Sequence, residues 1–372
     1  MKGRACRAGN RARQPGYRSR VRVVITGASG NVGSALSRRL QAAGEHDIVA
    51  VVRRVPNRAA TREWVSIDLS RPDCEPALQE VIRGADAVVH LAWAFQPSHD
   101  VRYLESVGVG GTQRILDACV ATGVGHLVHM SSVGAYSPKR DDNPVTEDWP
   151  VGGIPSSSYS SHKAAAEKLL DSFEQSVHGT AVARLRPGII GQRAAGSALL
   201  RYALPVLLPA RTVNAVPVIP LPDGLTVAMV HADNVADAIV RVLQQRAAGA
   251  FNLAAPTPVT AAMIAEALGA RWIKTPAPVL RALMLATWQA RLQPVGPGWL
   301  DMGCAVPPLD SSRARRELGW SPTVDAMGVL RETVEGMSHA AAGATAVLRR
   351  RTVVGEVSEL LSRGPISHRH ES

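Results

Sequence analysis

A tyrosine and a lysine lie four positions apart in YSSHK (159–163), a segment with the pattern of a helix start. Positions i and i+4 share one face of a helix, so the phenol of Tyr159 and the ammonium of Lys163 project to the same side. A neighbouring ammonium favours the phenolate and lowers a tyrosine pKa, normally about 10, toward a range useful for acid/base chemistry. Ser132, at the end of HLVHMSS (126–132), supplies a hydroxyl that can polarise a carbonyl. We therefore predict proton transfer at a carbonyl or alcohol oxygen, although Tyr-x-x-x-Lys alone also occurs by chance.

A glycine-rich string, TGASGNVG (26–33), follows an apolar strand pattern and opens a helix pattern. Glycines at such a turn let backbone N–H groups approach a pyrophosphate, and the helix N-terminus favours negative charge. Because a second strand follows near position 50, the string predicts a dinucleotide site rather than a tight structural turn. The residues expected to hold the phosphates are Gly27, Ser29, Gly30, Asn31, Val32 and Gly33.

The end of the second predicted strand bears on the kind of dinucleotide. Folds that bind NAD usually place a carboxylate about 20 residues beyond the glycine string, whereas this chain has Arg53 and Arg54. A guanidinium can hold a 2′-phosphate through two hydrogen bonds, and a carboxylate would repel it. We therefore expect NADP(H) in preference to NAD, unless the arginines are only a solvated strand end. Asp68, beside Leu69 at the end of the third strand, is expected to accept the adenine amino group.

Short Val- and Ile-rich runs alternate with helical patterns through the first two thirds of the chain. Apolar strands separated by helices indicate a parallel sheet covered on both faces. Right-handed crossovers then give a doubly wound α/β fold of the Rossmann type, which binds ligands at the carboxyl ends of its strands. The expected strands are VRVVITG (21–27), DIVAVVRR (47–54), WVSIDL (64–69), ADAVVHLA (85–92), HLVHMSS and TAVARLRP (180–187).

The remaining patterns suggest how the chain is divided. Residues 21–187 are expected to form the dinucleotide-binding domain, to which 224–250 return as a strand and a helix. The Pro-rich and less regular segments 188–223 and 251–340 are expected to form a smaller substrate lobe. We interpret 341–372 as a poorly ordered tail.

The net charge of +11 is concentrated at the start of the chain. Residues 1–20 hold seven basic residues and no acidic one, which leaves 35 basic against 31 acidic residues elsewhere. Such an arm could contact nucleic acid or an anionic membrane, but we interpret it as a solvated, disordered extension and expect neither partner. No run reaches the roughly 18 apolar residues of a membrane span. The four cysteines lack metal-ligand spacing, so we expect no metal and a reducing cytoplasm.

Taken together, these motifs resemble the extended short-chain dehydrogenase/reductase superfamily, in its NAD-dependent epimerase/dehydratase-like branch, over roughly residues 21–335. The resemblance depends on TGASGNVG, IDL (67–69), HLAW (90–93), GGT (110–112), HMSSVGAY (129–136), YSSHK and RPGIIG (186–191), with HADNVADA (231–238) and RRELGWSP (315–322) later in the chain. It implies that Tyr159 is the catalytic acid/base, that Lys163 lowers its pKa and binds ribose, and that Ser132 orients the carbonyl. It implies a small-molecule substrate and a homodimer as well. Further residues that it places along the cofactor are Leu91, Ala92, Trp93, Pro187, Gly188 and Ile189.

The chain departs from the family pattern at two places. Where the family commonly has Asn in an N-V-x-G-T string, this chain has Gly108, which has no side chain to steady a water in a proton relay. Nucleotide-sugar members usually carry an Arg shortly before the V-x-D-x-A segment, and the stretch 224–230 has none. The second departure predicts a less charged carbonyl or alcohol as substrate. The residues expected to border its pocket are Trp93, Phe95, Trp149, Met229 and the apolar run 198–221, of which all but Trp93 could equally be core.

These observations lead us to expect an NADP(H)-dependent oxidoreductase that moves hydride between nicotinamide and a carbonyl carbon of a small, relatively apolar substrate. Among enzymes, the alternative is a nucleotide-sugar epimerase or dehydratase that retains its NAD. A protein that senses dinucleotide without turnover also stays open, because Gly108 favours it while the pair Tyr159 and Lys163 opposes it.

Overall fold

The structure is a computed structural model that describes residues 20–44, 46–56, 63–95, 99–203, 209–293, 295–345 and 347–350. The basic arm expected at 1–20 lies outside these ranges apart from Arg20, as does the expected tail beyond residue 350. Among the described residues, no helix combines the length and the apolar character needed to cross a membrane.

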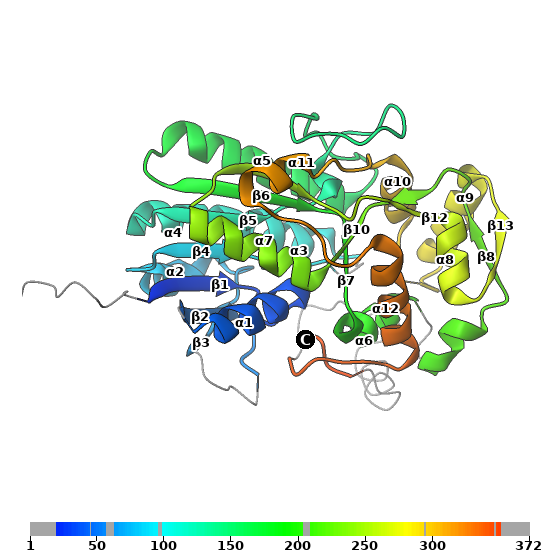
Figure 1. The fold of residues 1–372 in the computed structure, drawn as a ribbon, viewed down its shortest axis with the longest axis horizontal. Coiled ribbons are helices and arrows are strands. Elements are labelled where there is room, and N and C mark those ends of the chain that lie inside the picture. The colour runs from blue at the N-terminus through cyan, green and yellow to red at the C-terminus, as the bar shows by residue number, and fades with distance from the viewer. Residues whose placement is uncertain are drawn as a thin grey trace, which may run out of the picture.

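A seven-stranded parallel sheet, in the order β11-β6-β5-β4-β1-β2-β3, forms the centre of the described chain (Figure 1). Every residue of β4 and β5 is buried, as expected for strands covered on both faces. The strand order reverses between β1 and β4, where doubly wound sheets bind ligands. The predicted doubly wound α/β fold is confirmed. The strands are β1 (Val21–Thr26), β2 (His46–Val52), β3 (Glu63–Ser66), β4 (Ala87–His90), β5 (His126–Met130), β6 (Ala181–Pro187) and β11 (Gly249–Leu253).

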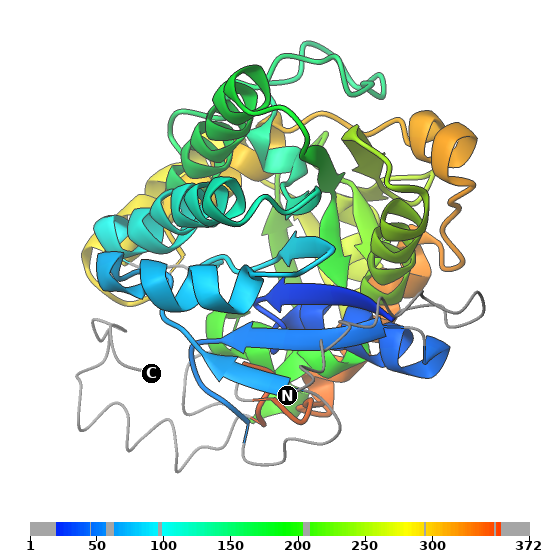
Figure 2. The ribbon, with the colours of Figure 1, turned by 90° about the vertical axis from the view of Figure 1, so that its left-hand side faces the viewer.

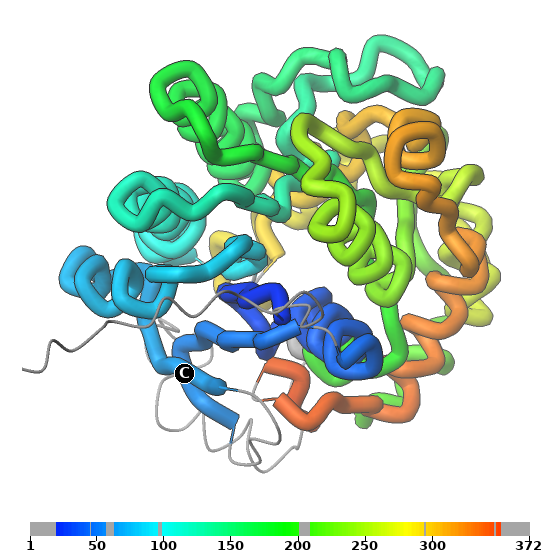
Figure 3. Tube along the Cα trace, turned by 60° about the vertical axis from the view of Figure 1, so that its left-hand side comes forward, coloured from blue at the N-terminus to red at the C-terminus, as the bar shows by residue number. Residues whose placement is uncertain are grey.

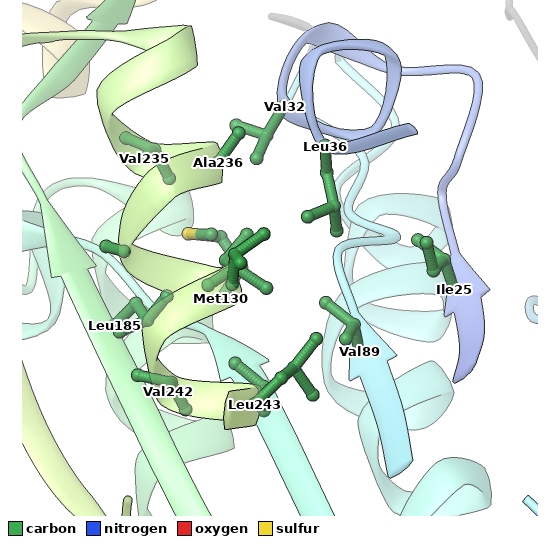
Figure 4. Close-up of a cluster of buried hydrophobic side chains, with 14 of the residues drawn as sticks. Ile25, Val32, Leu36, Val89, Met130, Leu185, Val235, Ala236, Val242 and Leu243 are labelled. Atoms are coloured by element: carbon green, nitrogen blue, oxygen red, sulfur yellow. The ribbon is translucent and has the colours of Figure 1, made fainter. Parts of the chain in front are cut away.

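Helices cover both faces of this sheet (Figure 2). One layer consists of α1 (Asn31–Ala43), α7 (Ala232–Gln245) and α11 (Ser312–Leu318). In its core, Leu36 of α1 and Leu243 of α7 share a buried cluster with Val89 of β4 (Figure 4). The other layer consists of α2 (Glu75–Ile82), α4 (Gly111–Thr122) and α5 (Ser158–Ser176). A short helix, α3 (Val101–Glu105), runs through a π-helical turn (Ser106–Gly110) into α4.

Beyond the sheet, the later part of the chain forms the expected less regular, mainly helical lobe. Its helices are α6 (Gly196–Ala203), α8 (Ala261–Leu268), α9 (Ala277–Gln289), α10 (Pro297–Ala305) and α12 (Ala326–Ser338). Its strand pairs are β7 (Ile189–Gly191) with β10 (Met229–His231), β9 (Thr226–Val227) with β12 (Val259–Thr260), and β8 (Val218–Leu221) with β13 (Arg271–Lys274). Short 3₁₀ turns lie at Pro72–Cys74, Val133–Ala135, Arg193–Ala195 and Ala210–Ala215.

The sheet and its core include segments that lie later in the chain than the sequence predicted. Helix α7 does return to the sheet, but β10 pairs with β7 outside it. The last strand of the sheet is β11, parallel to β6, of which residues 251–253 were assigned to the lobe. Trp320, also assigned to the lobe, is buried in the main core, and its Nε1 donates to the Asn234 carbonyl of α7 at 2.8 Å. The boundary placed between 250 and 251 is therefore wrong, because a run as short as GAFNL carries too little periodicity to assign.

Part of the expected tail is also packed. Within it, Gly343 N donates to the Leu348 carbonyl at 2.7 Å, Leu348 N donates to the Thr345 carbonyl at 3.1 Å, and Leu348 is buried. Figures 1 and 3 show this segment, in red, beside the blue start of the chain, where Thr345 Oγ1 donates to the Ser29 carbonyl at 2.6 Å. The expectation of poor order is therefore wrong for 341–345 and 347–350.

Candidate active site

The glycine turn between β1 and α1 leaves no room for a side chain at Gly27 or Gly33. Gly27 has a φ of +70°, and a Cβ there would lie 2.7 Å from the Ala92 backbone nitrogen. A Cβ on Gly33 would lie 2.4 Å from the Gly27 carbonyl oxygen. Gly30 caps α1 without a side-chain hydrogen bond, so the N–H groups of the first helical turn can serve an anion. The turn therefore fits the pyrophosphate of a dinucleotide.

A cleft opens beside this turn, at the carboxyl ends of β1, β2, β3 and β4. The cleft extends from the glycine turn to the residues that end or follow β2, β3 and β4. The predicted cofactor residues that line it are Gly27, Ser29, Gly30, Arg53, Asp68, Leu69, Leu91, Ala92 and Trp93. Tyr103, Val107 and Val347 line it as well, and sequence reasoning missed them because they belong to no motif.

Two of the three charged side chains predicted to hold the adenosine end, Arg53 and Asp68, face this cleft, each with a hydrogen-bond partner of its own. The Arg53 guanidinium hydrogen-bonds the Tyr103 hydroxyl, and Asp68 Oδ1 accepts from Ser70 N at 2.9 Å and from Ser70 Oγ at 2.8 Å. Arg54 is exposed and is not among the described residues that line the cleft. The structure thus brings Arg53 and Asp68, but not Arg54, to the cleft wall.

Several other predicted cofactor residues pack next to the cleft without being among the described residues that line it. Asn31 Nδ2 donates to the Ile190 carbonyl at 3.0 Å, and Val32 is buried in the core, so only their backbone N–H groups are available to a phosphate. A Cβ on Gly188 would lie 2.3 Å from the Ala228 carbonyl oxygen, which explains the glycine after Pro187. Ile189, the next residue, is 52% exposed at the start of β7.

Helix α5 and the end of β5 position the three predicted catalytic residues. Ser157 caps α5 by accepting from Ser160 N at 3.4 Å. In the first turn of the helix, the Tyr159 ring lies beside Ser132, since a Cβ on Gly134 would lie 3.1 Å from Tyr159 Cε1 and 3.4 Å from Ser132 Oγ. Ser132 Oγ accepts from Gly134 N at 3.0 Å. One turn further, Lys163 is 2% exposed, and its Nζ donates to the Met130 carbonyl at the end of β5.

The pKa of the phenol moves in the opposite direction from the prediction. Burial raises the pKa of Tyr159 to about 12, while the neighbouring Ser132 side chain acts to lower it. The ammonium of Lys163 is engaged elsewhere, 2.7 Å from the Met130 carbonyl oxygen and 3.4 Å from the centroid of the Trp93 ring. Burial holds the pKa of Lys163 well below its usual range, and the charge of Glu167 opposes that shift. The phenol is therefore protonated in this state and can donate a proton.

Aromatic rings surround this phenol. Trp299 of α10 stacks on Tyr159 with ring centroids 5.3 Å apart, Phe95 meets it edge-on at 5.4 Å, and Trp93 does so at 6.3 Å. Trp93 and Phe95 were expected to border a substrate pocket, whereas Trp299 was missed because its segment has no fixed spacing to the catalytic motif. Of the other expected residues, Met229 is buried in the core of the lobe, and the described part of 198–221 leaves out 204–208.

Trp149 does not join these rings. It packs beside the core cluster that contains Tyr136, and its Nε1 donates to the Ser137 carbonyl at 3.1 Å.

Gly108 lies against Trp93. A Cβ on Gly108 would lie 2.9 Å from Cζ2 of that indole. The Trp93 ring therefore occupies the space that a side chain at position 108 would need, and it also covers the ammonium of Lys163. The two unusual features of the sequence, a glycine at 108 and a tryptophan at 93, are parts of one packing arrangement.

Beneath this arrangement, a chain of hydrogen bonds fixes the carbonyl of Gly108. Thr112 Oγ1 donates to it at 2.8 Å and lies 3.3 Å from His90 Nε2, while His90 Nδ1 lies 2.7 Å from Thr26 Oγ1. A neutral His90 with its proton assigned to Nε2 satisfies every link. Burial lowers the pKa of His90 to about 3, helped by the charge of Lys163, which agrees with that neutral form.

A buried ion network that the sequence analysis did not foresee anchors α5. Glu167 accepts from Ser131 Oγ at 2.5 Å, from Arg186 Nε at 2.8 Å and from Arg184 Nη1 at 3.0 Å. Burial alone would raise the pKa of Glu167, but the hydrogen bond and charge of Arg186 bring it to about 2. The sequence contains one indication of this network. Glu167 lies four positions after Lys163 in α5, and Arg184 and Arg186 lie two positions apart in β6, so that they share one face of the strand.

No group of three or more His, Cys, Asp or Glu side chains within the described ranges is placed to hold a metal ion.

Comparison with known proteins agrees with this geometry. The profile of the NAD dependent epimerase/dehydratase family matches residues 23–254. The dTDP-glucose 4,6-dehydratase of Streptomyces griseus is 29% identical over 335 residues, which cover 84% of this chain and 92% of that enzyme. An uncharacterised protein of Mycobacterium tuberculosis is 28% identical over 265 residues, 70% of this chain but only 25% of that protein. The chain thus spans about a quarter of the length of that relative.

Solved structures share the architecture. The UDP-glucose 4-epimerase of Thermus thermophilus, in complex with NAD, superposes with a TM-score of 0.64 at 23% identity, covering 86% of this chain and all of that one. This likeness supports the fold, and the profile match covers most of the chain. The sheet, the glycine turn and the profile match together show that the chain belongs to the NAD dependent epimerase/dehydratase family of enzymes.

Proposed function

We propose that this enzyme transfers hydride between a nicotinamide and the oxygen-bearing carbon of a small carbonyl or alcohol substrate. The observation that carries the proposal is the placement of the Tyr159 ring beside the Ser132 hydroxyl, both of them next to Gly134, at the carboxyl edge of the sheet that also carries the glycine turn. A bound nicotinamide would supply or accept the hydride. In the reductive direction, the protonated phenol of Tyr159 donates its proton to the substrate oxygen, and the Ser132 hydroxyl hydrogen-bonds that oxygen.

Lys163 is the proposed ribose-binding partner of Tyr159. It projects from the same face of α5, and its ammonium is already desolvated between the Met130 carbonyl and the Trp93 ring. A buried ammonium with a lowered pKa exchanges its proton more readily than an exposed one. This property suits a group that returns a proton to the phenol after each turnover.

The surroundings of the phenol support a relatively apolar substrate. Trp93, Phe95 and Trp299 present ring carbons around Tyr159, and aromatic rings of this kind favour the faces of other rings and aliphatic groups. Residues 224–230 carry no arginine that could hold a diphosphate. An apolar ring ketone or secondary alcohol fits this chemistry best.

The test of this mechanism is Tyr159→Phe, which removes the hydroxyl and keeps the ring. Turnover of a panel of carbonyls and alcohols, followed at the absorbance band of the reduced nicotinamide, should fall about 100-fold or more, the usual contribution of a positioned acid/base. Binding of the reduced dinucleotide, measured by its fluorescence, should change little. Equal rates for the two proteins on every substrate that the wild type converts would contradict the proposal.

A second reaction, epimerisation or dehydration of a nucleotide sugar with retained NAD, is favoured by the match to a dTDP-glucose 4,6-dehydratase over 84% of this chain. It uses the same hydride and proton transfers but regenerates the nicotinamide in each cycle. UDP-glucose and dTDP-glucose should then be converted, as followed by chromatography, with no net change in nicotinamide absorbance. Net oxidation or reduction of the dinucleotide identifies the first reaction instead.

NADP(H) is the proposed cofactor, because Arg53 faces the cleft from the end of β2. Arg53→Ala should weaken NADPH binding about tenfold or more, since charge-assisted hydrogen bonds contribute about 1.5–3 kcal/mol, and should change NADH binding much less. Fluorescence titration measures both, with exposed Arg102→Ala as the matched control. Tighter binding of NADH than NADPH by the wild type would instead assign the ribose to Asp68, the carboxylate in the same cleft.

A further inference from the structure

The segment after α12, residues 341–345 and 347–350, is here termed the C-terminal clasp, and it is fastened at both ends. At its start, Ser197 N donates to the Ala341 carbonyl and Ser197 Oγ to the Ala340 carbonyl, each at 2.8 Å. Toward its end, Leu348 is 2% exposed. Between these points the clasp crosses the glycine turn.

One contact of the clasp acts on the turn itself. Thr345 Oγ1 donates to the Ser29 carbonyl at 2.6 Å, while Gly30 N, in the same peptide unit, donates to the Gly27 carbonyl at 2.9 Å. A peptide unit is planar, so hydrogen bonds at its oxygen and at its nitrogen together fix its orientation. That orientation sets how the chain enters α1, where the anion-binding N–H groups begin.

A second residue of the clasp faces the cleft. Val347 is 49% exposed and lines the same cleft as Gly27, Arg53 and Asp68. An apolar side chain in the wall of a dinucleotide cleft gains burial when a ligand covers it. The clasp therefore adds an apolar wall at the adenosine end of the cleft.

We propose that the C-terminal clasp is part of the dinucleotide site, in which Thr345 positions the glycine turn and Val347 contacts the bound dinucleotide, so that the clasp slows its release. This inference rests on the proposed dinucleotide-dependent function. It applies to the redox reaction, where release limits how often the cofactor is exchanged, and to the alternative with retained NAD, where slow release is a requirement.

Release of NADH and NADPH from the full-length chain tests the positioning role. The complex is mixed with excess oxidised dinucleotide, and the loss of reduced-nicotinamide fluorescence gives the dissociation rate. Thr345→Val keeps the shape but removes the donor, so dissociation should accelerate about fivefold, as expected for one lost hydrogen bond. Thr345→Ser restores the hydroxyl and should return the rate close to that of the wild type. A merely structural role would change the thermal stability of the dinucleotide-free protein without this pattern.

Val347→Asp tests the wall and does not depend on the folding of the Thr345 variants. It should weaken binding of either reduced dinucleotide about tenfold, because it sets a carboxylate against a polyanion. Val120→Asp, at a valine of α4 that is 55% exposed, is the matched control and should leave binding unchanged.

Unchanged or slower release of the dinucleotide from Thr345→Val would overturn the proposal for the clasp. Unchanged or tighter binding of the dinucleotide by Val347→Asp would overturn it as well, and tighter binding would show that the segment blocks the cleft. A failure of the proposed function would give a different result. The wild-type chain itself would then bind neither NADH nor NADPH, and the proposed role of the clasp would be wrong together with the dinucleotide site.

Discussion

At the scale of single residues, Gly108, Trp93 and Lys163 form the most distinctive part of the site. The glycine had suggested a damaged proton relay, but the structure gives it a packing reason, since the Trp93 ring occupies the adjacent space. The ring also lies 3.4 Å from the ammonium of Lys163, a cation–π contact that strengthens when the pair is desolvated. The side chain at position 108 therefore affects the surroundings of Lys163, the proposed partner of Tyr159, through the Trp93 ring.

Gly108→Ala should displace the Trp93 ring, because the new Cβ would lie 2.9 Å from Cζ2. We expect a loss of unfolding free energy on the order of 1 kcal/mol, as for other overpacked sites, together with slower turnover. Chemical denaturation measures the loss. In a Trp93→Leu background the same substitution should cost less, and a constant cost would argue against the contact. Gly303→Ala, where the nearest atom to a new Cβ is 3.8 Å away, is the matched control.

At the scale of elements, much of the fold follows from the sequence, and its limits have physical reasons. The strands β1, β2, β4, β5 and β6 were predictable because buried parallel strands are continuous apolar runs. Helix α5 and the glycine turn were predictable because their chemistry requires a fixed local spacing. Trp299, Val347 and β11 were not, because they reach the site or the sheet through tertiary packing, which leaves no periodic signal in a short segment.

The anchoring of α5 shows the same limit. Glu167 joins this helix to Ser131 after β5 and to both arginines of β6, and the helix carries Tyr159 and Lys163 two turns and one turn earlier. Only the spacing within the helix could be read from the sequence. The partners on β5 and β6 become neighbours only after the sheet has formed.

Glu167→Gln should destabilise the protein by roughly 3 kcal/mol at neutral pH, because it leaves two buried guanidinium groups without their shared carboxylate. The pKa of Glu167 lies near 2 in the folded state against a usual value of 4.5. The unfolded chain therefore binds the proton more readily, and the stabilisation present above pH 4.5 is lost as the pH falls toward 2.

Urea unfolding of wild type and variant between pH 7 and pH 3 measures this difference, which should shrink as the pH falls. A difference that stays constant over this range would refute the assignment. Glu174→Gln is the control, because Glu174 also pairs with Arg184 but is 36% exposed, and it should cost at most about 1 kcal/mol.

At the scale of the whole molecule, the part built on the seven-stranded sheet and the less regular lobe are interleaved along the chain. The sheet ends with β11, its helical layer includes α7 and α11, and its core includes Trp320. The clasp then returns to the turn at the end of β1. The compact unit therefore extends from β1 to about residue 350 rather than ending at Pro187.

A fragment of residues 21–187 should accordingly fail to fold, because it lacks β11 beside β6 and two of the three helices, α7 and α11, that cover one face of the sheet. Circular dichroism and hydrogen exchange should show little protected structure, whereas residues 20–350 should unfold cooperatively. A cooperative transition in the shorter fragment would show that its six strands suffice. The comparison needs no substrate and is independent of the proposed function.

The placement of β11 also matters while the protein is being made. When the ribosome has released everything through β6, that strand still presents an open edge, and its partner has yet to be translated. Contacts between segments so distant along a chain form slowly, and unpaired strand edges invite association with other chains. Synthesis in the cell should therefore pass through an interval of exposure that ends only when β11 pairs with β6, and chaperones that shield strand edges should raise the yield.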